Sequence, residues 1–61
     1  MFGKVRLTFY LMMGNSSVLQ SYNCSYIRVT EGKLVFQSSN DYKMRSFSLC
    51  RIHDVEIRPW E

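Results

Sequence analysis

The sequence has few of the residues from which metal centres and redox sites are built. Its 61 residues include two cysteines and one histidine, and Cys24 and Cys50 do not form a CxxC pair, the spacing typical of zinc ribbons and thiol redox motifs. His53 and Asp54 follow Cys50 closely, but structural zinc sites usually combine two such segments and this chain has one. The sequence therefore predicts no metal site and no cofactor, and it predicts two free, buried thiols.

Long apolar segments are also missing. No stretch approaches the roughly 20 consecutive apolar residues of a membrane helix, and Lys4 and Arg6 interrupt the N-terminal region, where a secretion signal would be continuously apolar. We therefore expect a cytoplasmic protein with reduced cysteines and no membrane partner. Without secretion, Asn15-Ser16-Ser17 and Asn23-Cys24-Ser25 are interpreted as turn residues rather than glycosylation sites.

The sequence has little that resembles an active site. Its three glycines are isolated from one another, so it lacks a glycine-rich phosphate-binding loop. A nucleophile needs its base within hydrogen-bond reach, and neighbours such as His53 and Asp54 point to opposite sides of an extended chain. We interpret these two residues as a turn before the last strand. The sequence predicts no catalytic residue and a non-enzymatic protein, because so short a chain can hardly enclose a substrate.

The clearest positive signal is a hairpin over residues 26–37. Apolar residues alternate with polar ones in Tyr26 to Thr30 and again in Lys33 to Gln37, on both sides of Glu31-Gly32. Alternation with a period of two on both sides of a two-residue break that contains glycine predicts two antiparallel strands and a tight turn.

Four further strands are predicted, at residues 4–12, 18–22, 42–49 and 55–57. The spacing of apolar residues changes to three and four at residues 49–53, which predicts one short helical turn there. A bulge or a short loop near Asn23 to Ser25 would bring the second strand into phase with the hairpin. We therefore expect residues 1–61 to form a single all-β domain, an antiparallel meander of five to six short strands forming a small barrel or sandwich.

The predicted core is small, because a domain of this size buries only about 60% of the surface of its unfolded chain. Small scaffolds usually add a staple, a metal or a partner subunit to such a core, and we therefore expect a homo-oligomer. The apolar residues in phase with the predicted strands are Val5, Leu7, Phe9, Leu11, Val18, Ile27, Val29, Leu34, Phe36, Phe47, Leu49, Ile52, Val55 and Ile57.

Many aromatic, aliphatic and thioether residues fall on the outer face or the rim of the predicted strands. Tyr, Trp, Met and Arg are the types enriched at the centres of protein interfaces. We therefore expect binding to an unidentified protein partner, as well as to a second copy, through an interface made of Tyr10, Met12, Tyr22, Tyr26, Arg28, Val35, Tyr42 and Trp60.

A second interpretation is nucleic-acid binding. The formal net charge is +3, and cations mixed with rings on one sheet face suit the phosphates and bases of a single strand. However, lysine and arginine also protect exposed strands from edge pairing, and the chain has no basic run. The residues that would form this face are Lys4, Arg6, Tyr10, Tyr26 and Arg28.

Three segments of the chain resemble a known pattern. The strand KVRLTFYLMMG, the hairpin YIRVTEGKLVF and the closing segment FSLCRIHDVEI are similar to very small β proteins encoded by phages and mobile elements of Gram-positive bacteria, in which a KLTFY strand, a V-x-DGKL-x-F hairpin and a closing L-x-x-I-x-x-V-x-I recur. The resemblance covers most of the chain and brings no catalytic residues. It implies an accessory protein in a bacterial host that binds host or phage macromolecules, as inhibitors of host enzymes or defence systems do.

Overall fold

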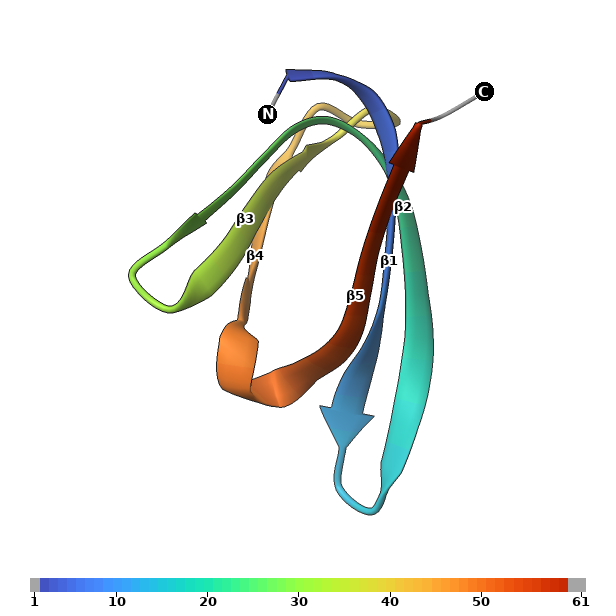
Figure 1. Cartoon of the computed structure of the whole chain (residues 1–61), viewed down its shortest axis with the longest axis vertical. Helices are drawn as coiled ribbons and strands as arrows, with labels where there is room; N and C mark the ends of the chain where they lie inside the picture. Colours follow the sequence, from blue (N-terminus) through green and yellow to red (C-terminus); the bar gives the residue numbers. More distant parts are fainter. Residues whose placement is uncertain (1, 60–61) are drawn as a thin grey trace.

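The computed structural model describes the backbone of residues 2–59 and the side chains of residues 4–59. It contains β1 (Phe2–Met13), β2 (Ser16–Thr30), β3 (Lys33–Ser38), β4 (Met44–Ser48), the 3₁₀ helix η1 (Leu49–Arg51) and β5 (Ile52–Pro59). All five strands are antiparallel to their neighbours in one sheet, in the order β4-β3-β2-β1-β5 (Figure 1). The predicted all-β class, the antiparallel arrangement, the number of strands and the helical turn are confirmed. The meander holds from β1 to β4, whereas β5 pairs with β1 rather than with β4.

Both hairpins close through two-residue turns in which glycine supplies a left-handed backbone. Gly14 has a φ of 63° at the first central position of the β1–β2 turn, as a type II′ turn requires. In the β2–β3 turn both central residues are left-handed, with φ values of 52° at Glu31 and 71° at Gly32, as in type I′. The predicted Glu31-Gly32 turn is therefore confirmed.

The two strands predicted at residues 18–22 and 26–30 form one continuous strand, β2. Its pairing with β3 shifts register between Cys24 and Tyr26, so the predicted bulge is confirmed. β2 pairs with β1 from Ser16 to Tyr26 and with β3 from Cys24 to Thr30. Because a bulge bends its strand, β2 bends between these two halves and carries two parts of the sheet that face each other (Figure 1).

The sheet rolls over on itself but does not close. β4 and β5 are its opposite edges, yet they are joined only through η1, and the four residue steps from Ser48 to Ile52 span at most about 14 Å. The two edges therefore approach each other at η1. They do not pair, so the finer expectation of a barrel or a sandwich is not confirmed.

The core fills the inside of this roll. Its buried residues are Leu7, Phe9, Cys24, Ile27, Leu34, Phe36 and Ile52, and Val5, Leu11, Tyr22 and Phe47 pack against them. Phe9 is the centre of an aromatic cluster, with its ring centroid 5.0 Å from that of Phe47 and 6.4 Å from that of Phe36. Most of the predicted core is therefore confirmed.

Five residues predicted in the core are exposed instead: Val18, Val29, Leu49, Val55 and Ile57. Ile57 pairs with the buried Leu7 and so faces the interior, but no strand covers β5 on that side, because the sheet does not close. Val29 lies beyond the last residue that β1 pairs with, Tyr26. A side chain in phase with the core is buried only where an opposing strand covers it.

The two thiols are in different environments. Both cysteines are free, but only Cys24 is buried, while Cys50 lies exposed in η1. The prediction of two buried thiols is therefore wrong for Cys50, since a single helical turn at the mouth of the roll has no element packed over it.

Candidate interaction surface

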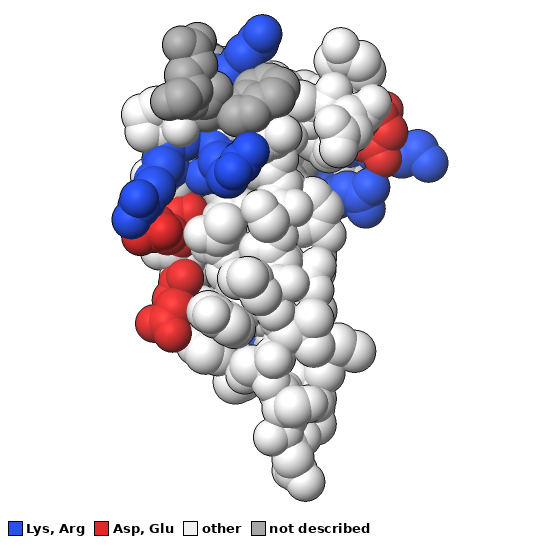
Figure 2. Space-filling view, turned by 90° about the vertical axis from the view of Figure 1, so that its right-hand side faces the viewer, with Lys and Arg blue, Asp and Glu red and all other residues white. Residues whose placement is uncertain are grey.

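One end of the molecule carries no charge. Residues 7–27 contain no Lys, Arg, Asp or Glu, and the β1–β2 hairpin within them extends past the other strands (Figure 1). β5 pairs with β1 only as far as Leu11, and β3 pairs with β2 only from Cys24 onward. In Figure 2 the charged side chains occupy the upper part of this face, and the tapering lower part has none. We call residues 10–19 the hairpin end.

The hairpin end exposes apolar side chains on both faces. Tyr10 pairs with Leu19 on the outer face, and Leu19 is 56% exposed. Met13 and Val18 lie in phase with Leu11 on the inner face and are also exposed. A two-stranded ribbon alone is marginally stable in water, and contiguous exposed apolar surface marks interaction sites. This end of the molecule is therefore the best candidate for a binding surface.

A hydrogen-bonded cluster ties the hairpin end to β5 on the outer face. Ser17 Oγ lies 3.1 Å from His53 Nε2, and His53 Nδ1 lies 3.1 Å from Asp54 Oδ2. Because a carboxylate only accepts, Nδ1–H donates to Asp54. The Ser17 hydroxyl donates to Nε2 where that nitrogen carries no proton and accepts from it where it does. The Tyr10 ring stacks on the His53 ring with centroids 5.5 Å apart. The expected turn at residues 53–54 is instead a bulge in β5, with a φ of 55° at Asp54.

The three side chains are connected in the order of a Ser-His-Asp triad, but they lie on the surface and link neighbouring strands. All three side chains are exposed, whereas catalytic triads work in sites that exclude water and orient a substrate. The pocket described below lies on the opposite face of the sheet, because its residue Leu11 points inward and His53 outward. We interpret the cluster as a link that positions β2 beside β1 and β5.

Replacing Ser17 tests this interpretation. Ser17→Ala is expected to lower the free energy of unfolding by about 0.5–1.5 kcal/mol, because one hydrogen bond is lost, and to leave hydrolysis of an activated ester unchanged. Urea denaturation and an absorbance assay measure the two effects. The control is Ser46→Ala, an exposed serine whose hydroxyl makes no hydrogen bond to the described part of the chain. Ester hydrolysis that disappears in Ser17→Ala alone would show that the cluster is catalytic.

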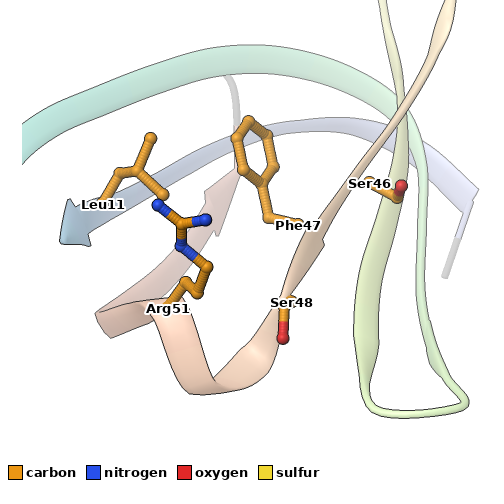
Figure 3. A pocket seen from close by; sticks show the side chains of 5 residues that line it. All are labelled: Leu11, Ser46, Phe47, Ser48 and Arg51. Carbon is orange, nitrogen blue, oxygen red and sulfur yellow. The ribbon is translucent and has the colours of Figure 1, made fainter. Parts of the chain in front are cut away.

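A shallow pocket of about 330 Å³ opens where the two edges of the sheet approach each other. It is lined by Leu11 from β1, Ser46, Phe47 and Ser48 from β4, and Arg51 from η1. Figure 3 shows the Arg51 side chain reaching toward Leu11 and Phe47 across the opening. Arg51 is exposed, and its guanidinium has no ion-pair partner among residues 4–59. The pocket is the mouth of the core rather than an enclosed site.

Metal binding finds no support in the arrangement of side chains. No group of three or more His, Cys, Asp or Glu residues within the described chain is placed to hold a metal ion. Cys24 is buried, and Cys50 Sγ lies 3.0 Å from Ser48 Oγ. None of the helical segments described is long and apolar enough to cross a membrane.

The structure separates the residues predicted for a protein interface. Tyr10 and Met12 lie together at the hairpin end, but Tyr22 packs against the core, where its ring centroid is 4.9 Å from that of Phe36. The others lie elsewhere. Tyr26 and Arg28 are on β2 and Val35 is on β3, within the β2–β3 hairpin. Tyr42 is exposed in the β3–β4 connection, and Trp60 falls outside the described residues.

The residues predicted for nucleic-acid binding are also divided. Lys4 and Arg6 lie in the first half of β1, away from the hairpin end. Tyr10 is four residues beyond Arg6 along the strand, a distance of about 13 Å. Arg6 Nε donates to Asn23 Oδ1 at 3.3 Å. Tyr26 and Arg28 belong to the other half of the bent β2. Rings and cations therefore do not form one stacking surface on this side of the sheet.

Two features of this end were not visible in the sequence pattern. Val18 and Leu19 become part of a surface because β3 and β5 stop short of them, which no local pattern encodes. Ser17 and His53 meet only through the strand order of the sheet. The absence of charge in residues 7–27 was the available signal. Comparisons of the chain with protein-family models, with curated proteins and with solved structures gave no match.

Proposed function

We propose that this chain is a non-enzymatic protein-binding module that associates with a second copy of itself and with another protein, through the hairpin end. The observation that carries the proposal is the combination of exposed apolar side chains and absent charge on residues 10–19. An accessory protein that binds a host or phage protein, as the sequence resemblance implies, would work through such a surface.

Three properties of the hairpin end support this function. Its side chains are of the types found at interface centres, Tyr, Met and Leu with little charge. It extends past the rest of the sheet, so a partner reaches both of its faces. Its base is braced through Ser17 and His53, and a preorganised surface loses less entropy on binding than a mobile one.

Nucleic-acid binding has less support from the arrangement of the cations. Arg58 pairs with Glu56 at 2.9 Å and Arg45 pairs with Asp41 at 2.7 Å, so part of the positive charge is neutralised locally. Residues 10–19 themselves carry no charge. The electrostatic attraction on which nucleic-acid affinity depends is therefore weak at this end.

A pair of matched methionine substitutions tests the proposed function. Met13 and Met44 are similarly exposed, at 53% and 56%, but Met13 lies at the hairpin end and Met44 in β4. Met13→Glu is expected to weaken self-association at least about tenfold, since a carboxylate would be buried without a partner. Met44→Glu is expected to leave it unchanged. Sedimentation equilibrium at micromolar concentration measures both variants, and a strictly monomeric wild type would refute the self-association.

A further inference from the structure

We propose that the free edge of β2 at residues 17–21 forms hydrogen bonds with the same edge of a second copy, so that the two sheets join through an antiparallel, two-fold symmetric pair of strands. This proposal rests on the self-association proposed above and specifies how the two copies meet.

The edge is open because β3 stops short of it. On that side of β2, the pairing with β3 begins at Cys24, and the Asn23 carbonyl accepts a hydrogen bond from the Ser39 N–H at 2.7 Å. From Asn23 toward the hairpin end, none of the described strands lies beside β2 on this side. Figure 2 faces this side of the molecule, and the tapering lower part of the view has no charged side chain.

The strand geometry identifies the peptide groups that face the open edge. In an antiparallel strand the N–H and C=O of one residue point to the same side, and alternate residues share that side. Since the Asn23 carbonyl points toward β3, the peptide groups of Ser17, Leu19 and Ser21 point to the open edge. Those of Val18 and Gln20 point to β1. Ser17, Leu19 and Ser21 are all exposed, and none of the described strands bonds to these peptide groups.

The other two edges of the sheet carry protective features that this one lacks. The β5 edge is interrupted by the bulge at Asp54 and ends at Pro59, and it carries the Glu56–Arg58 ion pair. The β4 edge has only five residues and includes Arg45. Bulges, proline, charge and short length are the devices by which edges avoid pairing. Residues 17–21 contain no charge, no proline and no glycine, so this edge is free to pair.

A second copy fits the edge because the segment is complementary to itself. With the two-fold axis at Leu19, Leu19 pairs with Leu19 of the second copy and Ser17 pairs with Ser21 of the second copy, so every outward peptide group of the three residues is used. The two Leu19 side chains then meet on the outer face, each beside a Tyr10. Self-complementary contacts of this kind are the rule in two-fold dimers.

The charge distribution is compatible with a second copy at this edge. Each chain has a net charge of +3, which opposes association, but antiparallel pairing at residues 17–21 places the two charged ends at opposite ends of the joint. Charges separated by more than the Debye length of about 8 Å are largely screened. A specific interface buries at least about 1,000 Å² in total, and 500 Å² per chain would be about one ninth of the 4393 Å² exposed surface. The apolar residues of the hairpin end lie beside the joint and supply this area.

Amide hydrogen exchange tests the pairing residue by residue. The amides of Ser17, Leu19 and Ser21 are expected to exchange rapidly at low protein concentration and at least about tenfold more slowly at high concentration. Those of Val18 and Gln20 should be protected at both concentrations, because they bond to β1. If the first three amides stay unprotected in the dimer, or become protected only when a segment of another protein is added, pairing with a second copy is refuted.

A proline substitution separates this proposal from the proposed function. Ser21→Pro removes an N–H that faces the open edge and leaves the ladder to β1 intact, and it changes no apolar side chain. Self-association should weaken at least about tenfold, while the control Ser21→Thr, which keeps the N–H, should behave as wild type in the same sedimentation experiment. Circular dichroism verifies that both variants fold. If Met13→Glu dissociates the dimer and a folded Ser21→Pro does not, the hairpin end is the interface but edge pairing is refuted.

Discussion

Phe9→Ala is expected to remove a large share of the stability of the fold. Phe9 is fully buried, and its ring contacts those of Tyr22, Phe36 and Phe47. Truncating a buried phenylalanine to alanine costs about 3–5 kcal/mol, because apolar contacts are lost and a cavity remains. A domain of 61 residues has a total stability of about 3–9 kcal/mol. The substitution therefore removes between about one third and all of the free energy that keeps the chain folded.

The matched control is Val29→Ala. The sequence pattern assigns Phe9 and Val29 equally to the core, but Val29 is 61% exposed, so its truncation should cost less than about 1 kcal/mol. Urea denaturation followed by circular dichroism measures both variants. Equal losses of stability would mean that the aromatic cluster is not the centre of the core.

The features predicted correctly from the sequence are those that depend on neighbouring residues. The β2–β3 hairpin follows from alternation and from one glycine that tolerates a left-handed backbone. The bulge follows from the change of phase within a single strand, since a strand can keep its inward face only by inserting a residue. The helical turn follows from the change of spacing after Ser48. Each of these signals lies within a few residues of the structure that it specifies.

Burial could not be predicted in the same way, because it depends on which strands stop short. Val18 and Ile57 both point toward the inside of the roll, but they are exposed because β3 and β4 do not extend over them. An inward phase is a property of one strand, whereas burial needs an opposing one. Tyr22 was predicted outside the core but packs against it, because the bend of β2 brings its ring onto Phe36.

The candidate surface was predicted only in part for the same reason. Tyr10 and Met12 were identified by residue type, and they do lie at the hairpin end. Leu19 and Ser21 carry no signal by type, since an isolated leucine or serine on a strand is ordinary. Their importance comes from the open edge beside them, which is a consequence of where β3 begins to pair with β2.

Stability is expected to fall by about 2–3 kcal/mol between about pH 9 and pH 11 because of Cys24. Burial raises the pKa of the Cys24 thiol from 9.0 to about 11, since the thiolate would lose its hydration in the core. Well below pH 9 the thiol is neutral in both the folded and the unfolded chain, so it causes no dependence on pH. As the pH rises further, the unfolded chain loses this proton first and unfolding becomes more favourable.

Comparing cysteine variants isolates this effect from other groups that titrate in the same range. Cys24→Ala should show a smaller loss of stability between about pH 9 and pH 11 than wild type, and Cys50→Ala, at the exposed thiol, is the matched variant for comparison. Urea denaturation at a series of pH values gives the free energies. Parallel curves for wild type and Cys24→Ala would show that the thiol has an ordinary pKa in the folded protein.

The same burial predicts a large difference in reactivity between the two thiols. Thiolates rather than thiols react with disulfide reagents, and Cys24 is both protonated near neutral pH and fully buried, whereas Cys50 is exposed. In the folded protein at about pH 8 we expect one thiol to react within the mixing time of an absorbance assay. The other should react only at the rate at which the core opens. Because that rate depends on core stability, Val29→Ala should hardly change it, while a substitution that opens the aromatic cluster should make Cys24 as reactive as Cys50.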